Sequence, residues 1–201
     1  MTALSASTWP MWLTLAVVVG YLVKQWLAPA PATRLHDQMR HDWLDAVSAA
    51  QGTEVLGVQT IRNSLMSCTM TATTATLAFM GGMSLLYSRW GQELAVAEQV
   101  PFQQHVLAVL VLLGLSFIMS MLSARQWHHA GFVAGMPVHS ACRAQWLPVG
   151  QRCVQRAGHY YALSVRLLMW CVPLLLVGVH AWAGLAAAVL LLLVLSLGID
   201  R

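Results

Sequence analysis

Six polar residues in the middle of the chain carry side chains that bind anions or protons. They form two groups, at 59–63 and 125–129: Gln59, Arg62, Asn63, Arg125, His128 and His129. Guanidinium and amide groups hydrogen-bond phosphate or carboxylate, and an imidazole changes its charge near neutral pH whereas a guanidinium does not. If the two groups meet, they suit an anion, a lipid headgroup or a proton-linked gate.

The same residues also have a structural interpretation. Arg62 and Arg125 lie where apolar runs begin or end, so their side chains can reach the membrane interface and hydrogen-bond headgroups or helix ends. Both interpretations stay open on the sequence. The functional one predicts that Arg62 or Arg125 hydrogen-bonds Gln59, Asn63, a histidine of the 128–129 pair or a terminal helix carbonyl.

A polar seam continues from the first group into an apolar run. At helical spacing its members follow one another along one side of a helix: Met66, Thr69, Met70, Thr73 and Thr76. Hydroxyl groups are unfavourable in lipid unless they are hydrogen-bonded, so we expect this side to face other helices, another subunit or a water-filled vestibule. Small residues around the seam also favour close helix packing and self-association, without a pore.

A metal site is a weak alternative. Two imidazoles and two thiols fall in one segment, His139, Cys142, Cys153 and His159, a ligand set that zinc accepts. Their spacing matches no standard zinc module. Methionines near the seam could bind cuprous ion, but thioethers in an apolar core mostly fill space. We expect no metal and no cofactor.

The composition predicts an all-α integral membrane protein. Of 201 residues, 58% are hydrophobic and 9% charged, against roughly 25% charged in soluble domains. Four apolar runs reach the length of about 20 residues that a crossing helix needs: 9–27, 65–87, 106–122 and 161–199. We therefore predict one transmembrane domain over 1–201 with four spans.

Two of these runs allow other interpretations. Residues 28–32 imitate a signal-peptide cleavage site, but no basic residue precedes residue 9, so we expect the first run to be a span. The last run is either one long helix kinked at Pro173 or two helices that turn at 180–184. We favour the kinked helix, because a second span from 185 to 199 would be short.

The basic residues predict an orientation. Nine of the 11 lie between the first and second spans, between the third and fourth, or in the adjoining span ends at Lys24 and Arg166, and only Arg89 and Arg201 lie elsewhere. Lysine and arginine favour cytoplasmic loops. We expect the protein to lie in the plasma (inner) membrane of a bacterium, with both termini outside. The net charge of +4 follows from this asymmetry and implies no nucleic-acid partner.

Residues 33–50 predict an amphipathic helix at the membrane surface. One side of it carries Leu35, Met39, Trp43, Leu44 and Val47, and the rest is charged. Gly52 would end this helix and Thr53 would begin the next. On the cytoplasmic side we expect the helices to continue beyond the apolar runs. The helix of the second span would begin at residue 53, that of the third would end at about 135, and that of the fourth would begin at about 156.

Three segments resemble a known family. Residues 58–66 with 72–75, residues 125–137, and residues 156–173 through Tyr160 and Tyr161 are similar to the signature segments of the bacterial and plant membrane proteins catalogued as domain of unknown function 599. The chain departs from that pattern at Arg166 and at residues 171–172. The resemblance implies a four-span architecture and importance for Gln59, Arg62, Asn63, Arg125 and His129. It implies no activity.

Two classes of function remain open. The first is a small-solute or ion conduit or transporter, built from the seam and the Arg/His groups as a homo-oligomer. The alternative is a non-catalytic accessory or structural subunit whose seam packs on a larger membrane complex. We do not expect an enzyme, because the sequence has no hydrolase, metalloprotease or phosphate-loop motif. The expected partners are the lipid bilayer and other membrane chains.

Overall fold

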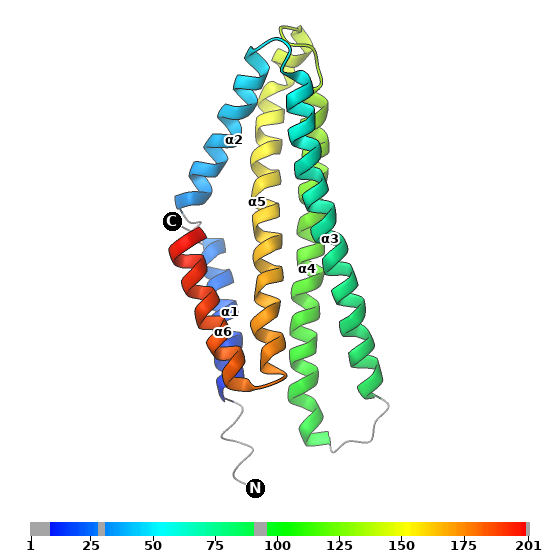
Figure 1. The fold of residues 1–201 in the computed structure, drawn as a ribbon, viewed down its shortest axis with the longest axis vertical. Helices are drawn as coiled ribbons and strands as arrows, with labels where there is room; N and C mark the ends of the chain where they lie inside the picture. The colour runs from blue at the N-terminus through cyan, green and yellow to red at the C-terminus, as the bar shows by residue number, and fades with distance from the viewer. Residues whose placement is uncertain (1–8, 28–30, 91–95, 200–201) are drawn as a thin grey trace. The chain divides into compact units, whose positions relative to one another are not determined.

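The computed structural model describes residues 9–27, 31–90 and 96–199, and these residues form helices with no strand (Figure 1). In chain order the elements are α1 (Trp9–Leu27), α2 (Pro31–Ala49), α3 (Glu54–Trp90), α4 (Val96–Ala134), α5 (Ala141–Val177), α6 (Ala181–Val194) and the π-helical turn η2 (Leu195–Ile199). The predicted all-α class is confirmed for the described part of the chain.

Two of the described helices are long and apolar enough to cross a membrane. They are Gln104–Ala134 within α4 and Ala141–Val177, which is α5; Ala181–Leu197 is apolar but shorter. The predicted spans 9–27 and 65–87 are helical, as α1 and as part of α3. Length and composition thus support a membrane location through α4 and α5.

The chain forms two compact units, and the three long helices contribute to both. Unit 1 comprises Met1–Pro31, Ala75–Leu115 and Arg166–Arg201, and unit 2 comprises Ala32–Thr74 and Ser116–Val165. Unit 2 contains α2 and most of the residues predicted to be functional. Its core includes Leu44, Ile61, Trp127 and Val154, and small residues make up the rest of this buried cluster.

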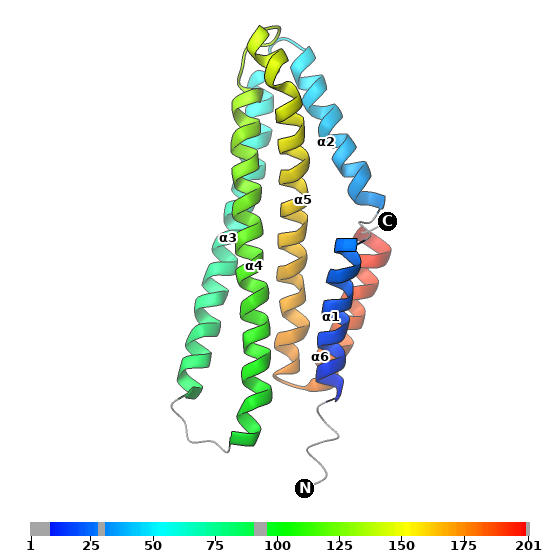
Figure 2. The same cartoon turned by 180° about the vertical axis from the view of Figure 1, so that it is seen from behind.

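The prediction of one helix kinked at Pro173 is wrong. Helix α5 continues past the buried Pro173 to Val177, and the backbone N–H groups of 178–180 then bond the carbonyls of Leu175 and Leu176. Helix α6 turns back and lies beside α1 (Figure 2). Gly184 permits this turn, because a Cβ there would lie 2.8 Å from the backbone nitrogen of Val177.

A helix is confirmed here, at Pro31–Ala49 where 33–50 was predicted, and Thr53 directly precedes α3, but its hydroxyl bonds carbonyls at the end of α2 and does not cap α3. Helix α2 begins at Pro31, a residue that suits the first helical position, and ends before Gly52, whose φ is +85°. The hydroxyl of Thr53 donates to the carbonyl of Val47 over 2.8 Å. Leu44 and Val47 are buried, whereas Leu35 is 66% exposed and Met39 60% exposed. This apolar exposure fits a helix that lies against lipid.

Helix α5 begins earlier than predicted, at Ala141 and not near Arg156. The hydroxyl of Ser140 accepts a hydrogen bond from the backbone N–H of Arg143 over 3.2 Å, as an N-cap does. This cap stabilises the first turn of α5. Pro148 follows one turn later and, because it has no N–H, removes one hydrogen bond from the helix. The two other extensions occur as expected, since α3 begins at Glu54 and α4 ends at Ala134.

Candidate functional site

The six polar residues predicted to form a cluster are all exposed in this chain. They are Gln59, Arg62 and Asn63 on α3 and Arg125, His128 and His129 on α4. Among the described residues, neither Arg62 nor Arg125 makes a hydrogen bond to any of the predicted acceptors, and that prediction is wrong. Each helix turns other side chains inward at this level, Ile61 on α3 and Ala124 and Trp127 on α4. The role of the six in function stays a prediction.

Helix α3 has one packed side and one outward side. Its packed side carries the buried Ile61, Cys68, Ala72 and Ala75. The seam residues lie on the outward side, where all five are exposed: Met66, Thr69, Met70, Thr73 and Thr76. We call the face made by these five residues with Gln59, Arg62 and Asn63 the outward face of α3.

The hydroxyl groups of α3 bond to its own backbone. Thr73 donates to the carbonyl of Thr69 over 2.9 Å, Thr74 to that of Met70 over 3.0 Å, and Thr69 to that of Met66 over 2.8 Å. Such bonds satisfy the hydroxyl hydrogens within the helix. The seam can therefore be exposed on a single chain. Of the three surroundings expected for it, other helices of this chain do not cover it, and another subunit or a water-filled vestibule stays a prediction.

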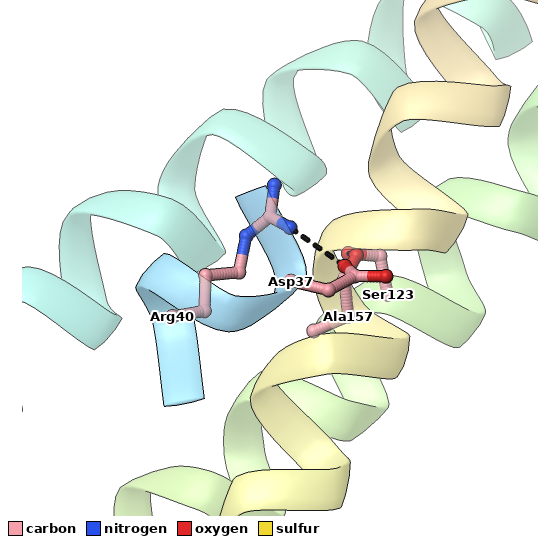
Figure 3. Close-up of polar contacts among 4 residues, drawn as sticks. All are labelled: Asp37, Arg40, Ser123 and Ala157. Carbon is pink, nitrogen blue, oxygen red and sulfur yellow. Dashed lines mark hydrogen bonds and ion pairs between the residues drawn. The ribbon is translucent and has the colours of Figure 1, made fainter. Parts of the chain in front are cut away.

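A second set of hydroxyl groups lies buried between α4 and α5. Ser164 of α5 donates to the carbonyl of Ser116 over 2.8 Å, and Ser116 of α4 donates to the carbonyl of Ser164 over 2.9 Å. The hydroxyl of Ser120 lies 2.7 Å from that of Ser164. One turn farther along, Ser123 donates to the carbonyl of Ala157 over 2.7 Å (Figure 3). Small polar residues therefore join these two helices.

Arg143 lies in the first turn of α5 and joins it to the ends of α2 and α4 in unit 2. Its side chain is 2% exposed, and Nη1 donates to the carbonyls of Ala134 and Met136 at the end of α4. Nη2 donates to the carbonyl of Val47 and the hydroxyl of Ser48 near the end of α2. A cation is favourable at these negative helix ends, which lack intrahelical donors. Arg143 is a structural residue.

Glu54 links the start of α3 to the connection between α4 and α5. Its carboxylate accepts a hydrogen bond from the backbone N–H of Val138 over 3.2 Å. The pKa of Glu54 lies below its ordinary value, first because its own backbone N–H bonds the carboxylate and then because Val138 does. The positive end of the α3 dipole favours the same charged form.

A groove in unit 2 has both polar and apolar walls. Its volume is about 380 Å³, and the residues that line it come from four helices: Met39, Arg40, Trp43, Thr60, Ser64, Ser67, Trp127, Gly158 and Tyr161. Arg40 is held by an ion pair of 3.0 Å with Asp37 on the same helix (Figure 3). The groove is a binding space formed entirely by residues of unit 2.

The described residues do not gather a metal site. No three His, Cys, Asp or Glu side chains come together in the described ranges. Of the four weak candidates, His139, Cys142 and His159 are exposed and Cys153 is buried. All four cysteines of the chain are free thiols.

Three features of unit 2 were not predicted from the sequence: the buried serines, the role of Arg143 and the groove. Ser116, Ser120 and Ser123 recur at spacings of four and three, which is a helical signal that could have been read. Arg143 and Arg40 were counted only as charges. Gly158 carried no signal, since its value lies in the space that its missing side chain leaves for Arg40.

Comparison with known proteins gives one match. A family model described as "Protein of unknown function, DUF599" matches residues 9–200. No curated protein and no solved structure matches the chain.

Proposed function

The chain belongs to the family of proteins of unknown function DUF599, and from this premise we propose that it is an integral membrane protein that works as a homo-oligomer. In this proposal the outward face of α3 lies at the contact between copies. The observation that carries it is the exposure of a guanidinium, two amides and several hydroxyls along one side of a helix that enters an apolar region.

The proposed topology has five crossings. Helices α4 and α5 meet the length and hydropathy that a span requires, and α1, α3 and α6 with η2 complete the set. The basic residues of the two long connections are cytoplasmic in this topology. Because α6 turns back from α5, its crossing brings the end of η2 to the cytoplasmic side, in place of the outside C-terminus expected from four spans.

An oligomer gives the outward face of α3 a partner of matching chemistry. Close contact between two copies needs small or flexible side chains, and the seam offers threonines and methionines. Arg62 and Asn63 of neighbouring copies would then meet at one membrane level. A ring of such faces supplies the polar lining of a small-solute or ion conduit.

An accessory subunit is the second candidate, and one observation favours it over a conduit within one chain. The groove on α3 is lined by Thr60, Ser64 and Ser67, and neither Arg62 nor Thr73 reaches it. A conduit within one chain would be expected to include those two residues. The same outward face would then bind a different membrane protein.

Disulfide cross-linking in native membranes tests the proposal. A Cys142→Ser background removes the exposed thiol, and Met70→Cys adds one on a side chain that is 65% exposed. We expect a disulfide-linked dimer of this chain on oxidation. The control is Leu190→Cys on α6, which is similarly exposed at 64% and should not cross-link.

The outcomes separate the two candidates. A cross-link from Met70→Cys only to a different protein would replace the homo-oligomer by an accessory subunit, and equal cross-linking of both variants would contradict a specific contact. For the conduit, solute or ion flux into proteoliposomes should be lost in Arg62→Ala and Asn63→Ala while membrane insertion is retained.

A further inference from the structure

The groove of unit 2 has a charge at one wall and aromatic surface at the others. Arg40 is the single charged residue among those that line it, and the aromatic rings among them are those of Trp43, Trp127 and Tyr161. Indole and phenol rings suit the boundary between headgroups and acyl chains. The groove therefore fits a molecule with a polar head and an apolar tail.

The guanidinium of Arg40 is held in place with donors to spare. Its Nη1 donates to Asp37 over 3.0 Å, and no described residue accepts a hydrogen bond from Nε or Nη2. An arginine has five N–H donors in a planar fork that matches phosphate oxygens. Gly158 provides the space beside it, because a Cβ there would lie 2.2 Å from Cζ of Arg40.

The hydroxyl groups at the groove present acceptors. Thr60 donates to the carbonyl of Leu56 over 3.0 Å and Ser64 to that of Thr60 over 3.1 Å, so their hydrogens are engaged within α3. The lone pairs of both oxygens remain for a ligand that donates hydrogen bonds. A primary ammonium group is such a donor, whereas a quaternary ammonium group has no N–H.

The charge of α2 selects between headgroups. The helix carries Arg34 and Arg40 against Asp37, Asp42 and Asp45, so it has one excess negative charge with its histidines neutral. Surfaces that bind anionic lipids instead carry clustered lysine and arginine. The ion pair of Arg40 with Asp37 matches a headgroup that carries one charge of each sign.

We propose that this groove binds a phospholipid with a primary ammonium headgroup, such as phosphatidylethanolamine, with its phosphate on the free N–H groups of Arg40. The ammonium group then bonds the hydroxyl oxygens of α3, and the acyl chains lie along Met39 and the aromatic walls. The site rests on the proposed membrane location, but it does not depend on the oligomer or on the conduit.

Lipid retention during purification tests the site. The full chain is placed in mixed micelles with equal amounts of phosphatidylethanolamine, phosphatidylcholine and phosphatidylglycerol, and bound lipid is measured by native mass spectrometry. We expect preferential retention of the ethanolamine lipid. Gly158→Ala and Arg40→Gln should each lower that preference about tenfold, the size of one lost charge-assisted contact.

A matched glycine provides the control. Gly81→Ala adds the same methyl group to a helix where nothing lies within 4 Å, so lipid preference should not change. Gly158→Ala should still fold, since the group it meets is the far end of a flexible side chain. Unchanged preference in Gly158→Ala and Arg40→Gln would overturn the site.

The remaining outcomes test each part of the headgroup. Preference for phosphatidylglycerol would overturn the charge assignment, and equal retention of phosphatidylcholine would overturn the role of the hydroxyl acceptors. If soluble glycerophosphoethanolamine competes for the groove as well as phosphatidylethanolamine does, the acyl chains do not contribute to binding. That result would overturn a membrane lipid as the occupant. None of these results changes the cross-linking of α3, so failure of this site is distinguishable from failure of the oligomer.

Discussion

The contact between α4 and α5 and the outward face of α3 use the same hydroxyl chemistry for different purposes. At the contact, the buried Ser116 and Ser164 each donate to the other's helix. On α3, Thr73 and Thr74 donate back to their own helix and stay exposed. A hydroxyl in an apolar helix therefore does not by itself mark a packed face, because the helix backbone is an equally available acceptor.

Among the buried side chains that hydrogen-bond between helices, removal of Arg143 should lower the unfolding free energy most. Arg143→Ala leaves the carbonyls at the ends of α2 and α4 without their donor, so we expect a loss of about 3 kcal/mol of unfolding free energy. Thermal unfolding of the detergent-solubilised chain, followed by circular dichroism, measures it. Arg143→Lys should lie in between, because an ammonium group cannot reach all four acceptors. A change below that of a surface substitution would contradict the structural role.

Ser164→Ala should have a smaller effect at the α4–α5 contact. The variant loses the bond to the carbonyl of Ser116 and the contact with Ser120, and we expect a loss of about 1 kcal/mol. The same unfolding measurement applies. A double variant with Ser116→Ala should lose less than the sum of the two single variants, since the residues share their bonds. Strict additivity would show that the serines act independently.

Glu54 should give unit 2 a dependence on acidic pH. Because the folded-state pKa of Glu54 lies below its ordinary value of 4.5, its stabilising contribution is present above pH 4.5 and is lost as the pH falls through the folded-state value. Melting temperatures measured between pH 6 and pH 3 should show a smaller fall in Glu54→Gln than in the unmodified chain. Equal curves would mean that other carboxylates account for the acid sensitivity.

Of these substitutions, Thr74→Ala should change the unfolding free energy least. Its hydroxyl bonds only the carbonyl of Met70 on an exposed side of α3, so unfolding free energy should change by no more than about 0.5 kcal/mol. A loss as large as that of Ser164→Ala would show that this side of α3 is packed in the purified protein, and it would favour a tight subunit contact there.

Local signals in the sequence were enough to identify the helices and several of their ends. Pro31, Gly52 and Thr53 bound α2 and α3 through fixed backbone preferences, which act over a few residues and so can be read directly. Apolar length likewise identified α1 and the apolar parts of α4 and α5. The turn after α5 was considered, at 180–184, but not favoured because a second span from 185 to 199 would be short. The close contact of Gly184 with Val177 that permits the turn forms only after α6 has folded back, so the sequence does not show it.

The amino-acid sequence by itself determined the all-α class, the long apolar helices and the amphipathic α2, since each follows from composition and periodicity along one segment. Only the tertiary structure decided which polar residues of each helix lie at a contact with another helix and which are exposed. It turned the serines of α4 inward and the threonines of α3 outward, and it set Arg40 beside Gly158 and Arg143 among the ends of α2 and α4. These arrangements join residues far apart in the chain, so no local pattern encodes them.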